Sequence, residues 1–185
     1  MSSITKKAIT LAFIRLAAKM PIEKISVAKI TDECGISRNT FYYHYRDVYA
    51  LVEDIVYTKS AKLFDLDRYD GSMEDALRFA AGYVKKNRRF IRNIYDSVGR
   101  STLEAYLSDI SKDALLRFVT NACDGRQLSD EAISAVCELC RSFLCAMALD
   151  WIGGDQAVDP LETVEKRLTM LRGCLGLILD NSVGL

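Results

Sequence analysis

The chain has 185 residues, of which half are apolar and two are proline, and its formal net charge is zero. This composition excludes an intrinsically disordered chain, because the apolar residues suffice for a core of one or two domains. The charge is unevenly spread. Residues 1–50 hold eight Lys and Arg against four Asp and Glu, a net +4, and residues 51–185 carry the balancing −4. A basic N-terminal segment on an acidic remainder indicates nucleic-acid binding at one end, unless the charges segregate by chance.

Apolar residues near the N-terminus recur at the spacing of an α-helix. Ile9, Phe13 and Leu16 belong to a series that continues to Met20, and Pro21 is expected to end this helix. We therefore predict that the chain begins with one amphipathic helix.

Residues 26–46 predict two short helices joined by a tight turn. Ser26 and Ser37 are good N-caps for the first and second helix. Gly35, between them, supplies the positive φ that a short turn usually needs. This layout is that of a helix-turn-helix, whose second helix enters the major groove of DNA.

The second helix of this motif carries side chains that suit DNA. Arg38 can form a bidentate pair with guanine, and Asn39 with adenine. Phe41 and Tyr45, four residues apart, are expected to face inward and leave the polar side chains outward. The alternative is a solvated face on a helical bundle. The candidate DNA-binding residues, which include neighbours suited to phosphates, are Ser26, Lys29, Ser37, Arg38, Asn39, Thr40, Tyr42, Tyr43, His44 and Arg46.

The stretch 35–45, Gly-Ile-Ser-Arg-Asn-Thr-Phe-Tyr-Tyr-His-Tyr, resembles the signature of the TetR family of bacterial transcription regulators. Residues 4–56 are similar to that family's DNA-binding domain. Two positions depart from the family pattern: Thr31 replaces a common Ala, and Val48 replaces a common phosphate-contacting Lys, a contact that Arg46 can supply instead.

The resemblance implies an all-α fold with two domains. Residues 1–47 would form a three-helix helix-turn-helix domain, and residues 48–185 a helical domain for dimerisation and ligand binding. Residues 87–107 are similar to the branch of the family that includes the co-activator of dihydroxyacetone-kinase operons.

Helical periodicity continues through the rest of the chain. We expect a helix from about Asp47 to Phe64 and a polar turn from Asp65 to Gly71. Breaks at Gly, at Asp-Gly and at Pro160 then separate helices over 72–86, 88–96, 100–122, 129–152 and 160–181.

The last predicted helix has a heptad-like apolar seam, in which Leu161 starts a series with steps of three and four residues. An ordinary core stripe within one chain would look the same. The resemblance implies that the last two long helices pair with their copies in a four-helix bundle. The candidate residues of a homodimer interface are Phe143, Val164, Leu168, Leu171, Leu175 and Ile178.

The resemblance also implies a small-molecule effector bound between helices of the second domain. Aromatic and flexible apolar residues of this region are the candidates: Tyr95, Tyr106, Phe143, Met147 and Trp151. The protein would then be a ligand-responsive repressor that binds a palindromic operator as a homodimer. The alternative is a DNA-bound co-activator or adaptor whose C-terminal domain binds a protein, which a cavity too small for a metabolite would favour.

No catalytic, cofactor or metal site is expected. Any triad must use His44, the single histidine, which lies on the predicted DNA-facing helix. Cys137 and Cys140 form a C-x-x-C without further ligands at zinc-site spacing, so inert thiols are the better interpretation. We find neither a signal peptide nor an apolar run of about 20 residues. The expected location is therefore the cytoplasm, with all six cysteines reduced.

Overall fold

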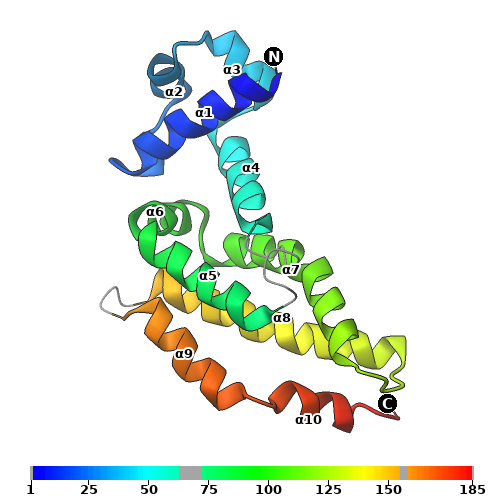
Figure 1. Ribbon diagram of the computed structural model, residues 1–185. Helices are drawn as coiled ribbons and strands as arrows, with labels where there is room; N and C mark the ends of the chain where they lie inside the picture. The colour runs from blue at the N-terminus through cyan, green and yellow to red at the C-terminus, as the bar shows by residue number, and fades with distance from the viewer. Residues whose placement is uncertain (1, 63–71, 155–157, 185) are drawn as a thin grey trace.

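The computed structural model describes residues 2–62, 72–154 and 158–184, and the regular elements in these ranges are all helices (Figure 1), which confirms the all-α fold. The predicted turn at 65–71 lies outside the described residues. The elements are α1 (Ser2–Ala17), the 3-10 turn η1 (Ile22–Lys24), α2 (Val27–Cys34), α3 (Arg38–His44), α4 (Val48–Ala61), α5 (Met73–Lys86), α6 (Arg88–Val98), α7 (Arg100–Ala122), α8 (Asp130–Gly153), α9 (Pro160–Leu171) and α10 (Cys174–Asn181).

Local capping produces the two short helices predicted over 26–46. The Ser26 hydroxyl accepts a hydrogen bond from the backbone N–H of Lys29, and Ser37 accepts one from Thr40. Gly35 ends α2 in the left-handed conformation, with φ of 69°. Each device satisfies backbone groups that a helix end leaves unpaired, so the turn is fixed by its own sequence.

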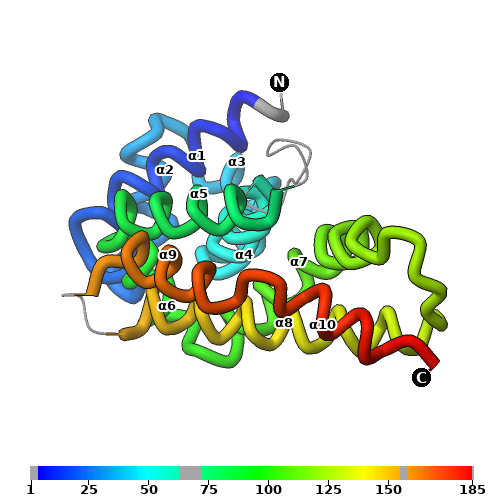
Figure 2. Tube along the Cα trace, turned by 60° about the horizontal axis from the view of Figure 1, so that its bottom comes forward, coloured from blue at the N-terminus to red at the C-terminus, as the bar shows by residue number. Residues whose placement is uncertain are grey.

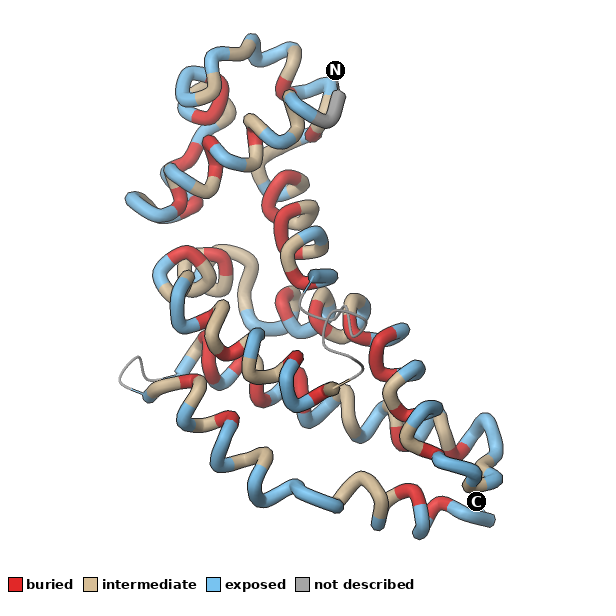
Figure 3. The backbone as a smooth tube through the Cα atoms, viewed as in Figure 1, coloured by how far each residue is buried: buried red, intermediate tan, exposed pale blue. Residues whose placement is uncertain are grey.

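The first three helices pack around fully buried apolar side chains. Phe13 of α1, Ile30 of α2 and Phe41 of α3 have no exposed surface. The same core continues through α4 into the C-terminal helices, as the band of buried residues in Figure 3 shows. The apolar core therefore does not divide at residue 47. The domain boundary placed there stays a prediction.

A polar cluster joins α1, α3 and α4 at the edge of this core. The Tyr45 hydroxyl donates to Asp54 Oδ2 at 2.8 Å, and the Lys6 ammonium meets Oδ1 of the same carboxylate at 2.8 Å. Lys6 also lies 5.5 Å from the centre of the Tyr45 ring. Burial, followed by the bond to Asp54, raises the pKa of Tyr45 well above its ordinary value. The cluster therefore fixes the end of α3 to the helix that leads into the second half of the chain.

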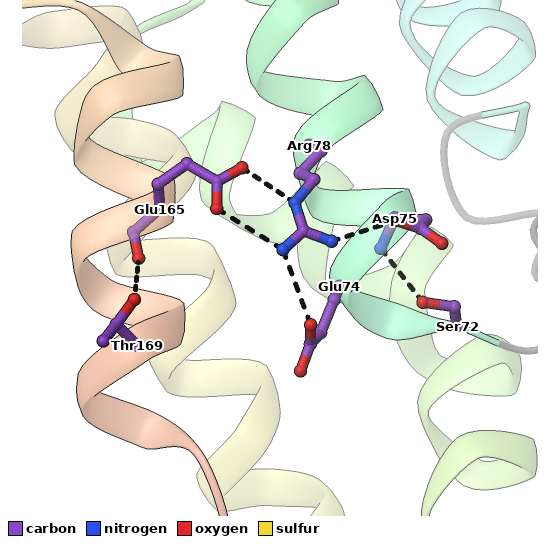
Figure 4. A network of polar contacts seen from close by, with 6 residues as sticks. All are labelled: Ser72, Glu74, Asp75, Arg78, Glu165 and Thr169. Atoms are coloured by element: carbon purple, nitrogen blue, oxygen red, sulfur yellow. Dashed lines mark hydrogen bonds and ion pairs between the residues drawn. The ribbon is translucent and has the colours of Figure 1, made fainter.

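The C-terminal helices are built on a hairpin of α7 and α8, with α5 packed against α9 (Figure 2). On the outside, the Arg78 guanidinium of α5 spans to Glu165 of α9, with its Nε 2.7 Å from Oε1, and also binds Asp75 and Glu74 (Figure 4). Because the groups of this cluster are exposed, we assign it to alignment of α5 with α9 rather than to a large share of stability.

By length and composition, α8 is apolar enough to cross a membrane, so the expectation that no stretch reaches this threshold was wrong. Core helices of soluble proteins pass the same test. Within the described residues, α8 packs against α5, α6 and α7.

The helix predicted over 160–181 is broken. It ends at Leu171, and Gly173 adopts φ of 80° before α10 begins at Cys174. Gly tolerates this left-handed conformation, so Gly173 separates two helices where the sequence predicts one.

The polar cluster gives a prediction for stability. Tyr45→Phe removes the hydrogen bond to the partly buried carboxylate of Asp54 and should lower the free energy of unfolding by about 1–2 kcal/mol. Tyr57→Phe, the control, removes an exposed bond to Asp109 and should cost less. Because the pKa of Tyr45 is raised on folding, its contribution is present below about pH 10 and falls as the pH rises further. Urea unfolding at pH 7 and above pH 10 measures this, and an equal loss for both variants would contradict it.

Candidate nucleic-acid interface

The third helix separates its inward and outward side chains as expected. Phe41 and Tyr45 are buried, whereas Tyr42 is 55% exposed and Tyr43 is 82% exposed. Arg38 and Asn39, in the first turn of the helix, are exposed. The structure therefore exposes guanidinium, amide and phenol groups on α3, whereas Phe41 and Tyr45 of the same segment are buried.

Other candidates of the N-terminal region have partners inside the protein. The Lys29 ammonium donates to the carbonyl of Lys24 at 2.7 Å, which leaves two of its three N–H donors for a phosphate or for water. The Ser37 hydroxyl caps α3 and lies 2.9 Å from Thr40 Oγ1, and the ring of His44 packs edge to face on Tyr43. Arg46 is 80% exposed beside Asp47, at 3.3 Å.

Asn93 of α6 joins this N-terminal unit (α1–α3) to the C-terminal helices. Its amide nitrogen donates to the carbonyls of Ala17 at 2.9 Å and Met20 at 2.7 Å, and its amide oxygen accepts from the N–H of Ile22 at 3.2 Å. Sequence reasoning missed this residue, because an asparagine within a helix does not reveal a partner more than 70 positions away.

The same face of α6 makes an aromatic contact with α1. The rings of Phe13 and Phe90 meet edge to face, with their centroids 6.5 Å apart. On a further side of α6, Arg92 donates to the carbonyl of Gly153 at the end of α8 at 3.0 Å. The sixth helix therefore contacts both the N-terminal unit and the core hairpin.

The five candidate effector residues do not line one site. Tyr95 packs against Gly153, where an added Cβ would lie 2.8 Å from its ring. Tyr106 contacts Tyr57 of α4 with tilted rings, whose centroids are 5.4 Å apart. Met147 is 2% exposed and belongs to the core, as does Trp151, whose Nε1 has no hydrogen-bond partner among the described residues.

Phe143, the remaining effector candidate, lines an open apolar groove of about 450 Å³. The groove lies between the hairpin of α7 and α8 on one side and α9–α10 on the other, with the start of α5 at one edge. A second, inner cavity of about 100 Å³ lies between α4, α5, α6, α7 and α8. Sequence periodicity predicts which face of a helix is buried, but it does not show where the packed helices leave a cavity between them.

The predicted dimer seam divides in the structure. Leu171, Leu175 and Ile178 line the groove beside Phe143. Val164 has no exposed surface within its own chain, so its side chain is unavailable to a second copy, and that assignment is corrected here. Leu168 packs partly buried against the same core. The break at Gly173 redirects the seam, which would otherwise continue along one straight helix.

Other apolar side chains of this region point outward and were not predicted. Met170 is 78% exposed on α9 and Leu177 is 64% exposed on α10. Leu139 on α8 is 54% exposed and lines the groove. Together with Phe143, these residues form an apolar surface over α8–α10, which we call the C-terminal apolar surface.

The thiols that were interpreted as inert lie on α8. Cys137 and Cys140 are partly buried, and burial raises the pKa of both. Raised pKa values make the thiolate, the reactive form, less populated. Among the described residues, no group of three or more His, Cys, Asp or Glu side chains is placed to hold a metal ion.

Comparisons with known proteins agree with this architecture. No curated protein sequence matches the chain. The solved structure of the dihydroxyacetone kinase operon activator DhaS is similar with a TM-score of 0.73 and 21% identity, covering 94% of this chain and 97% of that chain. The fatty acid degradation regulator FadR from Bacillus halodurans is similar with a TM-score of 0.63 and 13% identity, covering 95% of this chain and 94% of that chain. At these identities the two structures show the fold alone.

A family model described as a transcriptional regulator C-terminal region matches residues 71–173, which is more than half of the chain. The match lies in the C-terminal helices and is independent of the helix-turn-helix sequence at the N-terminus. The chain therefore belongs to the TetR family of transcriptional regulators.

Proposed function

We propose that the protein is a homodimeric, ligand-responsive repressor that acts in the cytoplasm and binds a near-palindromic operator through α3. The exposed face of α3 carries this proposal. Arg38 and Asn39 are free of the core, and the helix behind them is held by Phe41. A helix that presents donors of this kind on a rigid support matches the width of the major groove.

The side chains of α3 divide into two roles. Arg38 and Asn39 lie at the start of the helix and would read base edges. Tyr42, Tyr43 and Arg46 are exposed toward its other end and would contact phosphates, which position the protein without carrying sequence information.

Dimerisation would bring two copies of α3 to one operator. The C-terminal apolar surface supports this step, because large apolar side chains exposed on three successive helices gain by being covered. A helix such as α10 has apolar residues on its groove side, including Ile178, and on its outer side, at Leu177. Both sides are covered if α10 lies between its own chain and a second copy.

The response to a ligand would pass through α6. Phe90 and Ile94 of this helix line the inner cavity, and Phe90 also touches Phe13 in the N-terminal unit. Asn93 holds α1 and η1. A ligand that favours a different position of α6 would change the spacing of the two recognition helices, provided that it binds the two states with different affinity.

A second candidate is a DNA-bound adaptor that recruits a protein. The small size of the inner cavity, about 100 Å³, favours it, because pockets for drug-sized ligands measure about 300–1,000 Å³. The open groove would then receive a partner protein. Retention of an apolar peptide by the wild-type dimer, without binding of any small molecule, would favour the adaptor.

The readout prediction compares two exposed arginines. Arg38→Ala should weaken operator binding by about 1–3 kcal/mol and relax the preference at one base pair of each half-site. Arg46→Ala, the matched control, removes the same charge but should weaken all sequences evenly. Affinities across a set of single-base operator variants measure both effects. An unchanged preference profile for Arg38→Ala would contradict the base-reading role.

The assembly prediction concerns α10. Leu177→Glu would place an unpaired charge in an apolar interface, so the variant should be monomeric at micromolar concentration and bind the operator weakly. Leu11→Glu changes a comparably exposed leucine, on α1, and should leave the dimer intact. Sedimentation equilibrium distinguishes these outcomes, and a monomeric wild-type protein would overturn the dimer.

A further inference from the structure

The inner cavity combines apolar walls with three polar side chains. Ile55 of α4, Ile94 of α6 and Leu107 of α7 are among its apolar walls. Lys59 and Ser60, which are adjacent on α4, and Tyr83 of α5 also line it. A mostly apolar cavity with a few polar groups is the usual composition of a small-molecule site.

None of these three polar side chains forms a hydrogen bond or ion pair with another residue in the described part of the chain. Ser60 as a whole residue is 8% exposed, but its hydroxyl is not one of the fully buried atoms without a partner, which among the described residues are Ser97 Oγ and Trp151 Nε1. Burial raises the pKa of Tyr83 above its ordinary value. The lining of the cavity thus includes two hydroxyl-bearing side chains and one lysine that have no partner among the described residues.

The ammonium selects the charge of that ligand. A lysine beside an apolar cavity, with no carboxylate partner among the described residues, gains most from a bound anion, because screening by water is reduced there. The Ser60 and Tyr83 hydroxyls can donate to the same anion. A carboxylate accepts up to four such bonds and fits this set of donors.

The volume selects the size of the ligand. About 100 Å³ is smaller than the roughly 150 Å³ apolar cavity that binds benzene. A long acyl chain or a fused ring system does not fit without rearrangement of the helices.

We propose that the inner cavity binds a small monocarboxylate, with a short alkyl body between α4, α6 and α7 and its carboxylate paired to Lys59. This inference rests on the proposed function in one respect, namely that the occupant of this cavity is the effector. The apolar body contacts Ile94 on the helix that carries Asn93, so occupancy acts on the element that holds α1.

Calorimetric titration with straight-chain acids from propionate to octanoate, and with the matching primary alcohols, tests the ligand class. For wild type, affinity should rise about fourfold for each methylene that is buried and fall once the chain exceeds the cavity. The acids should bind about tenfold more tightly than the alcohols, as expected for one charge-assisted contact. Equal binding of acids and alcohols would overturn the assignment to an anion.

Two variants locate the site. Lys59→Gln should abolish the preference for acids, whereas Lys62→Gln, the control, removes an exposed lysine that lines a different surface hollow and should retain it. Ala148→Leu, which fills the cavity, should abolish binding of both acids and alcohols while the helical circular dichroism and melting temperature show a folded protein. Unchanged binding in the folded Ala148→Leu variant would place the ligand elsewhere.

Operator binding, measured separately with a duplex, distinguishes this inference from the proposed function. Absence of acid binding in a wild-type protein that binds the operator would overturn the ligand assignment and leave the DNA-binding function intact. Acid binding without any change in operator affinity would support the ligand class and contradict the ligand response.

Discussion

The amide side chain of Asn93 bonds to three backbone groups of the N-terminal unit and so ties that unit to α6. The end of α1 leaves the carbonyls of Ala17 and Met20 without helical partners, and η1 begins with an unpaired N–H at Ile22. An asparagine has two donors and an acceptor on one planar group, so it can satisfy all three backbone groups at once. A carboxylate could only accept from the N–H group, and an ammonium could only donate to the two carbonyls.

This contact gives α6 its importance in the fold. The helix carries Asn93 and Phe90 toward α1, Ile94 toward the inner cavity and Arg92 toward the end of α8. Packed helices tolerate a shift only as rigid bodies, because interiors are close-packed. A displacement of α6 by a ligand would therefore move the N-terminal unit rather than dissipate in the core. The Tyr45–Asp54–Lys6 cluster connects α3 to α4 in the same way, so two routes join the helices around the cavity to the recognition helix.

The parts of the fold that depend on local chemistry could be predicted from the sequence. Ser26, Gly35 and Ser37 fix the helix-turn-helix through bonds to neighbours three or four positions away. The alternation of Phe41 and Tyr42 between core and solvent follows from helical geometry alone. The bounds of α4 to α8 agree with the predicted helices to within a few residues.

The parts that depend on long-range packing could not be predicted. The seam over 160–181 has the period of one helix, yet Gly173 breaks it, because a left-handed glycine leaves no mark on apolar spacing. Trp151 and Met147 are residue types that are common in ligand sites, but in the structure both are buried among neighbouring side chains. Lys29 was assigned to DNA from its charge, which does not reveal that its ammonium also donates to the carbonyl of Lys24. Which side chain meets Asn93 or borders a cavity is decided by tertiary contacts that one sequence does not display.

The measurement that tests the central claim most directly is a salt titration of operator binding. If the N-terminal unit binds DNA, the logarithm of affinity should fall with the logarithm of salt concentration with a slope of about −4 to −8 for a dimer, because each cation that neutralises a phosphate releases about 0.9 counterions. Joint substitution of Lys85 and Lys86 by Ala should leave the slope unchanged, since both lie at the end of α5 and Lys85 is paired with Asp159. A flat slope for wild type, or one that depends on these two lysines, would contradict DNA binding through α3.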